Sequence, residues 1–165
     1  MRKAIALATG LAILAVANHS IYSREHLLAD GRIALLELAP VDPRSLMQGD
    51  YMALRFKASD DALGRWPKKG LEDGRIVLQV DSRGVANFSR LDDGTPLAAD
   101  ELRIRYRVRA DQVKFATNAY FFQEGDAKLY ERARYGEFRV APDGECLLTG
   151  MRGEKLEVLG PTGKQ

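Results

Sequence analysis

Residues 102–109 alternate strictly between apolar side chains and arginines. Successive side chains of a β-strand point to opposite faces of its sheet, so this pattern predicts a strand with one apolar face and one arginine-bearing face. The arginines of this row are Arg103, Arg105, Arg107 and Arg109. Their planar guanidinium groups could bind phosphates, an anionic lipid surface or an acidic protein partner. The alternative is a solvated sheet face whose arginines pair with Asp and Glu on neighbouring strands.

Two hairpin patterns extend this prediction to a β-rich domain. Residues 75–88 and 138–149 each contain two strand-like runs around a turn that ends in glycine. A further strand is expected at 32–39, and short helices at 60–64 and 126–134. We therefore predict an α+β, β-rich fold, in which an N-terminal transmembrane helix precedes one mostly antiparallel sheet domain with one or two short helices.

The N-terminus carries positive charge and then an apolar run. Arg2 and Lys3 precede fourteen residues, 4–17, that contain no charge. Positive charge followed by an apolar stretch is typical of an export signal whose N-terminus stays inside. We predict a transmembrane signal anchor at residues 1–22 and a helical stalk at 23–31. This would place the protein in the cell inner membrane as a single-pass protein with its C-terminal domain in the periplasm.

Cleavage of this segment is the alternative. The sequence Ala15-Val16-Ala17 has the small residues of a signal-peptide cleavage site. Cleavage after Ala17 would release a secreted periplasmic binding module. In either case the chain is long enough for one ordinary domain, expected at residues 32–159 and followed by a disordered tail at 160–165.

Composition excludes several classes of function. The chain has 25 basic and 23 acidic residues, so its overall charge does not indicate a nucleic-acid partner. The single cysteine, Cys146, rules out an internal disulfide and is expected to be a buried hydrophobic side chain. His19 and His26 could share a helix face, but no third ligand lies near them in sequence, so no metal site is expected. The chain contains no phosphate-binding or dinucleotide-binding motif, and we expect no cofactor.

The most distinctive motif combines a capped turn with the start of a strand. Asp42 and Pro43 suit the first positions of a short helix, because the carboxylate can accept from a free amide and proline there loses no hydrogen bond. Arg44 could pair with an acid across the turn. Gly49 would end the turn with a positive φ. Residues 50–56 then alternate as a strand does.

This motif resembles that of the GDYXXLXY family of membrane-anchored bacterial proteins. The matching residues are Gly49, Asp50, Tyr51 and Leu54. Phe56 stands where the family has its final Tyr, which keeps the ring and loses the hydroxyl. The resemblance extends from the N-terminal apolar segment to residues 120–125. It carries no activity that can be assigned to particular residues, and it implies a multi-pass envelope protein as the partner.

We therefore expect a non-enzymatic accessory subunit whose extracytoplasmic domain binds a multi-pass envelope protein. The alternative is an envelope hydrolase of the signal-peptidase type, with Ser45 as nucleophile or with Asp50 and Glu124 as a carboxylate pair. A serine nucleophile of this type needs a lysine base, which no segment of the sequence identifies. In the structural interpretation, Asp50 and the Glu124-Gly125 turn accept backbone N–H groups and stiffen their loops.

Overall fold

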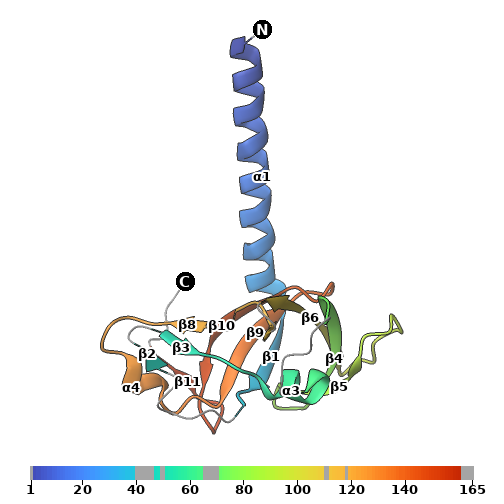
Figure 1. Ribbon diagram of the computed structural model, residues 1–165, viewed down its shortest axis with the longest axis vertical. Coiled ribbons are helices and arrows are strands. Elements are labelled where there is room, and N and C mark those ends of the chain that lie inside the picture. Colours follow the sequence, from blue (N-terminus) through green and yellow to red (C-terminus); the bar gives the residue numbers. More distant parts are fainter. Residues whose placement is uncertain are drawn as a thin grey trace.

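The computed structural model describes residues 2–39, 47–48, 51–64, 71–109, 112–117 and 119–160. These residues form a β-rich domain with one large sheet, one small sheet and a long N-terminal helix (Figure 1). The helices are α1 (Arg2–Asp30), α3 (Lys57–Leu63) and α4 (Ala127–Tyr130). The large sheet contains, in spatial order, β11 (Val158–Leu159), β10 (Cys146–Arg152), β9 (Tyr135–Val140), β1 (Arg32–Glu37), β5 (Val85–Leu91), β4 (Gly74–Val80), β6 (Glu101–Arg109) and β7 (Gln112–Lys114). The small sheet contains β2 (Met47–Gln48), β3 (Tyr51–Ala53) and β8 (Ala119–Phe121).

Strand β1 lies in the middle of the large sheet, between β5 and β9. It pairs antiparallel with β9 along its whole length, from Arg32 opposite Val140 to Glu37 opposite Tyr135. Its pairing with β5 is parallel and short, and it joins Leu35 to Val85. The other described pairs of this sheet are antiparallel. The first strand of the domain therefore connects the β4–β7 half of the sheet to the C-terminal hairpin.

The core lies on one face of the large sheet. Leu102, Ile104 and Tyr106 of β6 are buried there, while the arginines between them point away. The ring of Phe138, on β9, meets the ring of Phe56 edge-on, with a centroid separation of 5.2 Å. Burial of apolar side chains of this size is the main stabilising contribution in a domain of this length.

The large sheet curls until β6 reaches the turn between β9 and β10. The N–H of Arg105 donates to the carbonyl of Gly144 at 2.8 Å. Gly144 has a φ of +92°, which favours glycine, and a Cβ there would lie only 3.3 Å from the Arg105 nitrogen. This close approach places the outward face of β6 beside the residues that follow the turn.

The short helices differ in extent from the sequence prediction. Helix α3 begins three residues earlier than expected, after Phe56, and the Ser59 hydroxyl donates to the Phe56 carbonyl at 2.6 Å. Helix α4 has only four residues, and its N-cap Asp126 makes no side-chain capping bond. A helix that lacks this cap has little to hold a longer first turn, since side-chain caps satisfy the free N–H groups at a helix start.

Helix α1 projects from the domain, and only its C-terminal end lies near the sheet (Figure 1). The Arg139 side chain, on β9, donates to the carbonyl of Gly31 at 3.1 Å and fixes this end. The N–H of Gly31 in turn donates to the carbonyl of Leu27 at 2.9 Å. The domain therefore positions the last turns of α1, including residues 19–27.

The predicted transmembrane helix is wrong. In the described part of the chain, no helix is both long enough and apolar enough to cross a membrane. The uncharged run at 4–17 is shorter than the roughly 20 apolar residues that a span requires. The fold-class prediction fails in this element, and the predicted single-pass anchoring in the inner membrane, which depended on the same helix, is wrong with it.

Candidate functional site at the arginine row

Each arginine of the β6 row has a carboxylate partner from another element. Arg103 lies 3.6 Å from Asp92, and Arg109 lies 3.0 Å from Asp73. Asp73 also accepts the N–H of Val108 at 2.7 Å, and this bond, with Arg109 beside it, lowers the pKa of that carboxyl. The two ends of the row are therefore paired one to one.

The middle of the row has fewer carboxylates than arginines. Arg105 donates to Oε1 of Glu145 at 2.6 Å, and Arg107 donates to the same oxygen at 3.2 Å. The two guanidinium groups stay partly exposed, with 45% and 51% of their side-chain surface accessible. Two cations thus share one oxygen of a single carboxylate and keep donors that face solvent.

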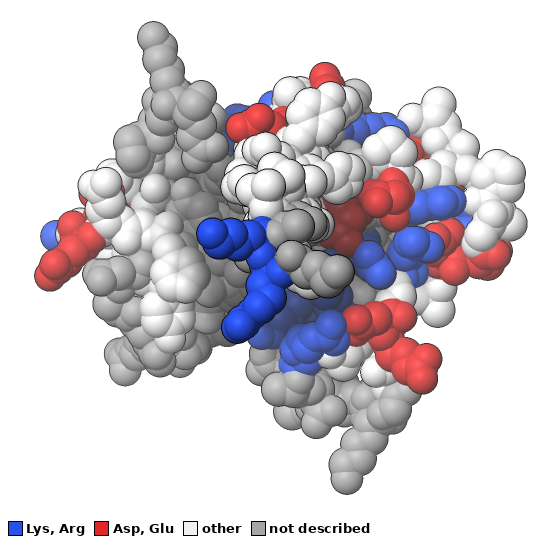
Figure 2. Space-filling model, turned by 90° about the horizontal axis from the view of Figure 1, so that it is seen from above, with Lys and Arg blue, Asp and Glu red and all other residues white. Residues whose placement is uncertain are grey.

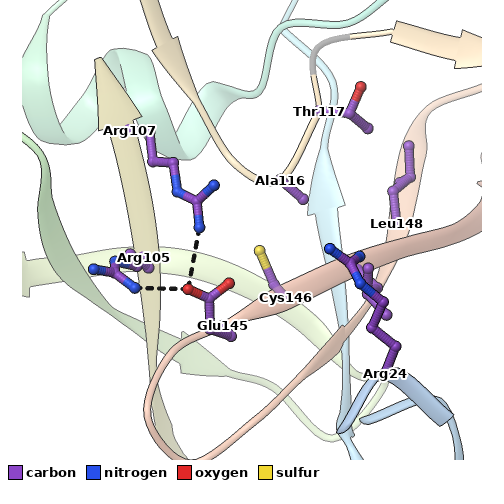
Figure 3. Close-up of a pocket in the computed structure, with 9 residues that line it drawn as sticks. Arg24, Arg105, Arg107, Ala116, Thr117, Glu145, Cys146 and Leu148 are labelled. Atoms are coloured by element: carbon purple, nitrogen blue, oxygen red, sulfur yellow. Dashed lines mark hydrogen bonds and ion pairs between the residues drawn. The ribbon is translucent and has the colours of Figure 1, made fainter. Parts of the chain in front are cut away.

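A cavity of about 290 Å³ opens beside this pair (Figure 3). Helix α1 contributes Arg24, and the loop between β7 and β8 contributes Ala116 and Thr117. Arg24 has no hydrogen-bond or ion-pair partner in the described part of the chain. The full lining is Arg24, Arg105, Arg107, Ala116, Thr117, Glu145, Cys146, Leu147 and Leu148. We call this the arginine pocket; its three guanidinium groups outnumber its one carboxylate.

Figure 2 shows the face of the domain from which α1 rises, with Lys and Arg next to Asp and Glu. The charges on this face are interspersed, so a long-range field of one sign does not define the site. The site is defined instead by the local excess of positive charge in the arginine pocket. An anionic group placed there would meet donors from both α1 and β6.

A second cavity, of about 320 Å³, lies between α1 and the β9–β10 turn. It is lined by His19, Tyr22, Ser23, His26, Leu27, Ala141, Asp143 and Glu145. His26 pairs with Asp30 on its own helix at 3.1 Å. Within the described ranges, no group of three or more His, Cys, Asp or Glu side chains could hold a metal ion. Glu145 lines both cavities and separates them.

Cys146 lies on the wall of the arginine pocket, and its thiol is buried. Burial raises the pKa of the thiol to about 12, and the neighbouring charge of Glu145 acts in the same direction. A cysteine reacts as its thiolate, so this thiol is a poor nucleophile at neutral pH. The side chain contributes a small apolar surface to the pocket.

We expect iodoacetamide to alkylate Cys146 at pH 8 more than about a hundredfold more slowly in the folded protein than in guanidinium chloride, because both burial and the raised pKa suppress the thiolate. Mass spectrometry of timed aliquots measures the two rates on the same single-cysteine chain. Labelling of the folded protein at the rate of the unfolded chain would contradict this description of the pocket wall.

The apolar part of the predicted motif lies in the core. Leu54 and Phe56 are buried, and Tyr51 on β3 stands opposite Phe121 on β8, with ring centroids 5.8 Å apart. Leu54 and Phe56 therefore belong to the hydrophobic core, whereas the contact between Tyr51 and Phe121 lies within the small sheet. Asp42, Pro43, Arg44, Ser45, Gly49 and Asp50 lie outside the described residues, and with them the expected positive φ of Gly49.

The Glu124-Gly125 pair occupies a turn before α4. Gly125 has a φ of +93°, and the N–H of Asp126 donates to the carbonyl of Gln123 at 3.0 Å across the turn. The Glu124 side chain is exposed. The proposed pairing of Glu124 with Asp50 falls partly outside the described residues and stays a prediction.

Two residues of the arginine pocket, Arg24 and Glu145, were missed by the sequence prediction. Arg24 belongs to the predicted helical stalk. Glu145 follows Gly144, and the sequence analysis uses that glycine only to predict a hairpin turn. The acidic residue directly after Gly144 was a usable signal, because the prediction asked for acidic partners of the arginine row on neighbouring elements. The sequence alone does not identify this acidic partner, because Glu145 reaches Arg105 and Arg107 only through the curl of the large sheet.

Comparison with known proteins identifies the family. The family model described as GDYXXLXY protein matches residues 13–151. No curated protein and no solved structure matches the chain. The matched segment includes β1 to β9 and most of β10, so it contains the core and the β6 arginine row. Since the match covers most of its 165 residues, the chain belongs to the GDYXXLXY family.

Proposed function

We propose that this protein is a non-enzymatic binding subunit that recognises an acidic segment of another protein at the arginine pocket. The observation that carries the proposal is that Arg105 and Arg107 share one oxygen of Glu145. Arg24 adds a third cation from α1. The partner class that we propose, from the family resemblance, is a multi-pass membrane protein, of which this chain would be an accessory subunit.

The energetics of exposed ion pairs favour binding at this place. An exposed pair contributes no more than about 1 kcal/mol, because water competes with it, so the contacts of Glu145 hold the two arginines weakly. A partner that covers the pocket would exclude water and strengthen each contact with its own carboxylates.

Charge reversal of the arginine pair tests this proposal. The tagged full-length protein is purified from cells, its companions are identified by mass spectrometry, and the most abundant one is purified for titration. The double variant Arg105→Glu, Arg107→Glu should weaken binding by a factor of about 100 or more, because each substitution turns an attraction into a like-charge repulsion. The affinity of the unchanged protein should also fall as ionic strength rises.

The matched control is Arg109→Glu, which makes the same substitution on the same face of β6 but outside the pocket. It should leave the affinity within about threefold of the unchanged protein. Melting temperatures of all variants establish that they fold. Undiminished binding by a folded double variant would refute the proposed function. If the double variant does not fold, Arg24→Glu on the exposed helix surface replaces it, with the same expected loss of binding.

A further inference from the structure

We propose that Glu145 is a built-in competitor for the arginine pocket, and that an acidic side chain of the partner binds by displacing it from Arg105 and Arg107. This inference rests on the proposed function and adds how the site is regulated. A carboxylate of the chain itself already occupies the arginine pair. A partner carboxylate that binds the same donors has to replace it.

The contacts of Glu145 allow this exchange. Its side chain is 41% exposed and uses only Oε1 for both arginines. Its backbone is held independently, because its N–H donates to Asp143 Oδ1 at 2.9 Å and the preceding Gly144 carbonyl accepts from the N–H of Arg105 at 2.8 Å. The carboxylate can therefore turn about its side-chain bonds while the β9–β10 turn stays in place.

The second cavity provides a place for the displaced carboxylate. Glu145 lines this cavity as well as the arginine pocket. Across it, α1 contributes the imidazole of His19 and the hydroxyls of Tyr22 and Ser23. His26 also lines the cavity but pairs with Asp30, and the Asp143 carboxylate lines it from the turn side. A carboxylate turned in this direction stays solvated and near hydrogen-bond donors, so its displacement does not bury an unpaired charge.

The charge count gives the direction of the effect. With Glu145 in place, the three arginines of the pocket carry one compensating negative charge, which also repels an incoming carboxylate. Glu145→Gln keeps the size of the side chain, removes the repulsion of an incoming carboxylate, and weakens the competition to neutral hydrogen bonds. Each exposed ion pair that no longer has to be broken accounts for up to about a fivefold change in affinity. We expect Glu145→Gln to tighten binding by about five- to tenfold.

The test titrates the full-length protein with a probe of defined chemistry. The probe is an acetylated hexapeptide with two adjacent glutamates between glycine and serine, and its counterpart has glutamine at both positions. NMR signals of the arginine Nε–H groups report occupancy of Arg105 and Arg107 directly. The glutamate peptide should shift these signals in the unchanged protein and shift them at five- to tenfold lower concentration, about the factor estimated above, in Glu145→Gln.

Two variants serve as controls. Glu37→Gln makes the same substitution in the partner of Lys57, outside the pocket, and should leave the titration unchanged. Glu145→Asp keeps the charge but shortens the side chain, and its affinity should lie between those of the unchanged protein and Glu145→Gln. If Glu145→Gln lowers the melting temperature, the affinity of Glu145→Asp relative to that of the unchanged protein tests the competitor role instead.

The outcomes separate this inference from the proposed function. If the glutamate peptide does not shift Arg105 and Arg107 in any variant, both proposals fail. If it shifts them equally in the unchanged protein and in folded Glu145→Gln, the proposed function stands and the competitor role is wrong. If inorganic phosphate shifts them at lower concentration than the peptide does, the site prefers phosphate over acidic segments. The proposed ligand, an acidic side chain of a protein partner, is then wrong.

Discussion

Replacing Phe138 by alanine should lower the free energy of unfolding by about 3–5 kcal/mol. Phe138 is fully buried on β9, and its ring packs edge-on against Phe56. Alanine would remove the apolar contacts of the ring and leave a cavity that the surrounding strands can fill only in part. Since domains of this size are stable by about 5–15 kcal/mol, the variant should be close to unfolded at physiological temperature.

Chemical denaturation of both proteins in urea measures this loss. The matched control is Phe121→Ala, the same substitution at a phenylalanine that is 73% exposed on β8. This control should change the free energy of unfolding by no more than about 1 kcal/mol, the contribution of its cross-strand ring contact with Tyr51. A loss below about 1 kcal/mol for Phe138→Ala, with an unchanged slope against urea, would show that the ring does not fill the core as described.

Replacing Gly136 by alanine should lower the free energy of unfolding by about 1–3 kcal/mol. Outside tight sites, Gly→Ala commonly stabilises a fold by restricting the unfolded chain. At Gly136 a Cβ would lie 2.9 Å from Cε1 of Phe56 and 3.1 Å from Cδ1 of Leu148. The Phe56 ring is itself buried and already packs against the rings of Phe115 and Phe138. The cost of overpacking therefore exceeds the entropic gain, and Gly136→Ala should destabilise the fold rather than stabilise it.

A double-mutant cycle identifies the clash. Combining Gly136→Ala with Phe56→Leu should cost less than the sum of the two single losses, because the smaller side chain makes room for the added methyl group. Gly150→Ala on the adjacent strand is the control, since a Cβ there would meet no atom within 4 Å. Additive losses in the cycle would place the strain elsewhere than at the Phe56 ring.

The alternation of residues 102–109 was sufficient to predict which side chains of β6 face the core. Leu102, Ile104 and Tyr106 are buried, as a period of two requires. Both hairpin turns also lie where their glycines indicated, because positive φ angles at Gly84 and Gly144 are a local property of the chain. Such features depend on neighbours in sequence and can be read from it.

The position of β1 and the curl of the large sheet could not be read in this way. Pairing of Leu35 with Val85, and of Arg105 with Gly144, joins segments whose separation in sequence leaves no local pattern. The apolar N-terminal segment was assigned to a membrane from its composition, and the described helix does not support that assignment. Composition shows that a segment is apolar, but it does not show whether that segment contacts lipid, protein or water.

The same distinction applies to the candidate site. Arg105 and Arg107 were predicted, since their spacing places them on one face of a strand. Arg24 and Glu145 were not, because they reach the pocket only when α1 docks on β9 and the β9–β10 turn meets β6. Arg105 and Arg107 therefore follow from the pattern of one strand, whereas the pocket as a whole forms only when α1, β6 and the β9–β10 turn come together.

The central position of β1 also determines when this domain can form during synthesis. Residues of β1 leave the ribosome before those of the other strands of the large sheet, yet their antiparallel partner β9 follows more than ninety residues later. Until β9 emerges, one edge of β1 has no strand to pair with, and the halves of the sheet cannot join. Pairing over such a sequence distance is slow, so this edge of β1 stays open to other pairing partners until β9 has been synthesised.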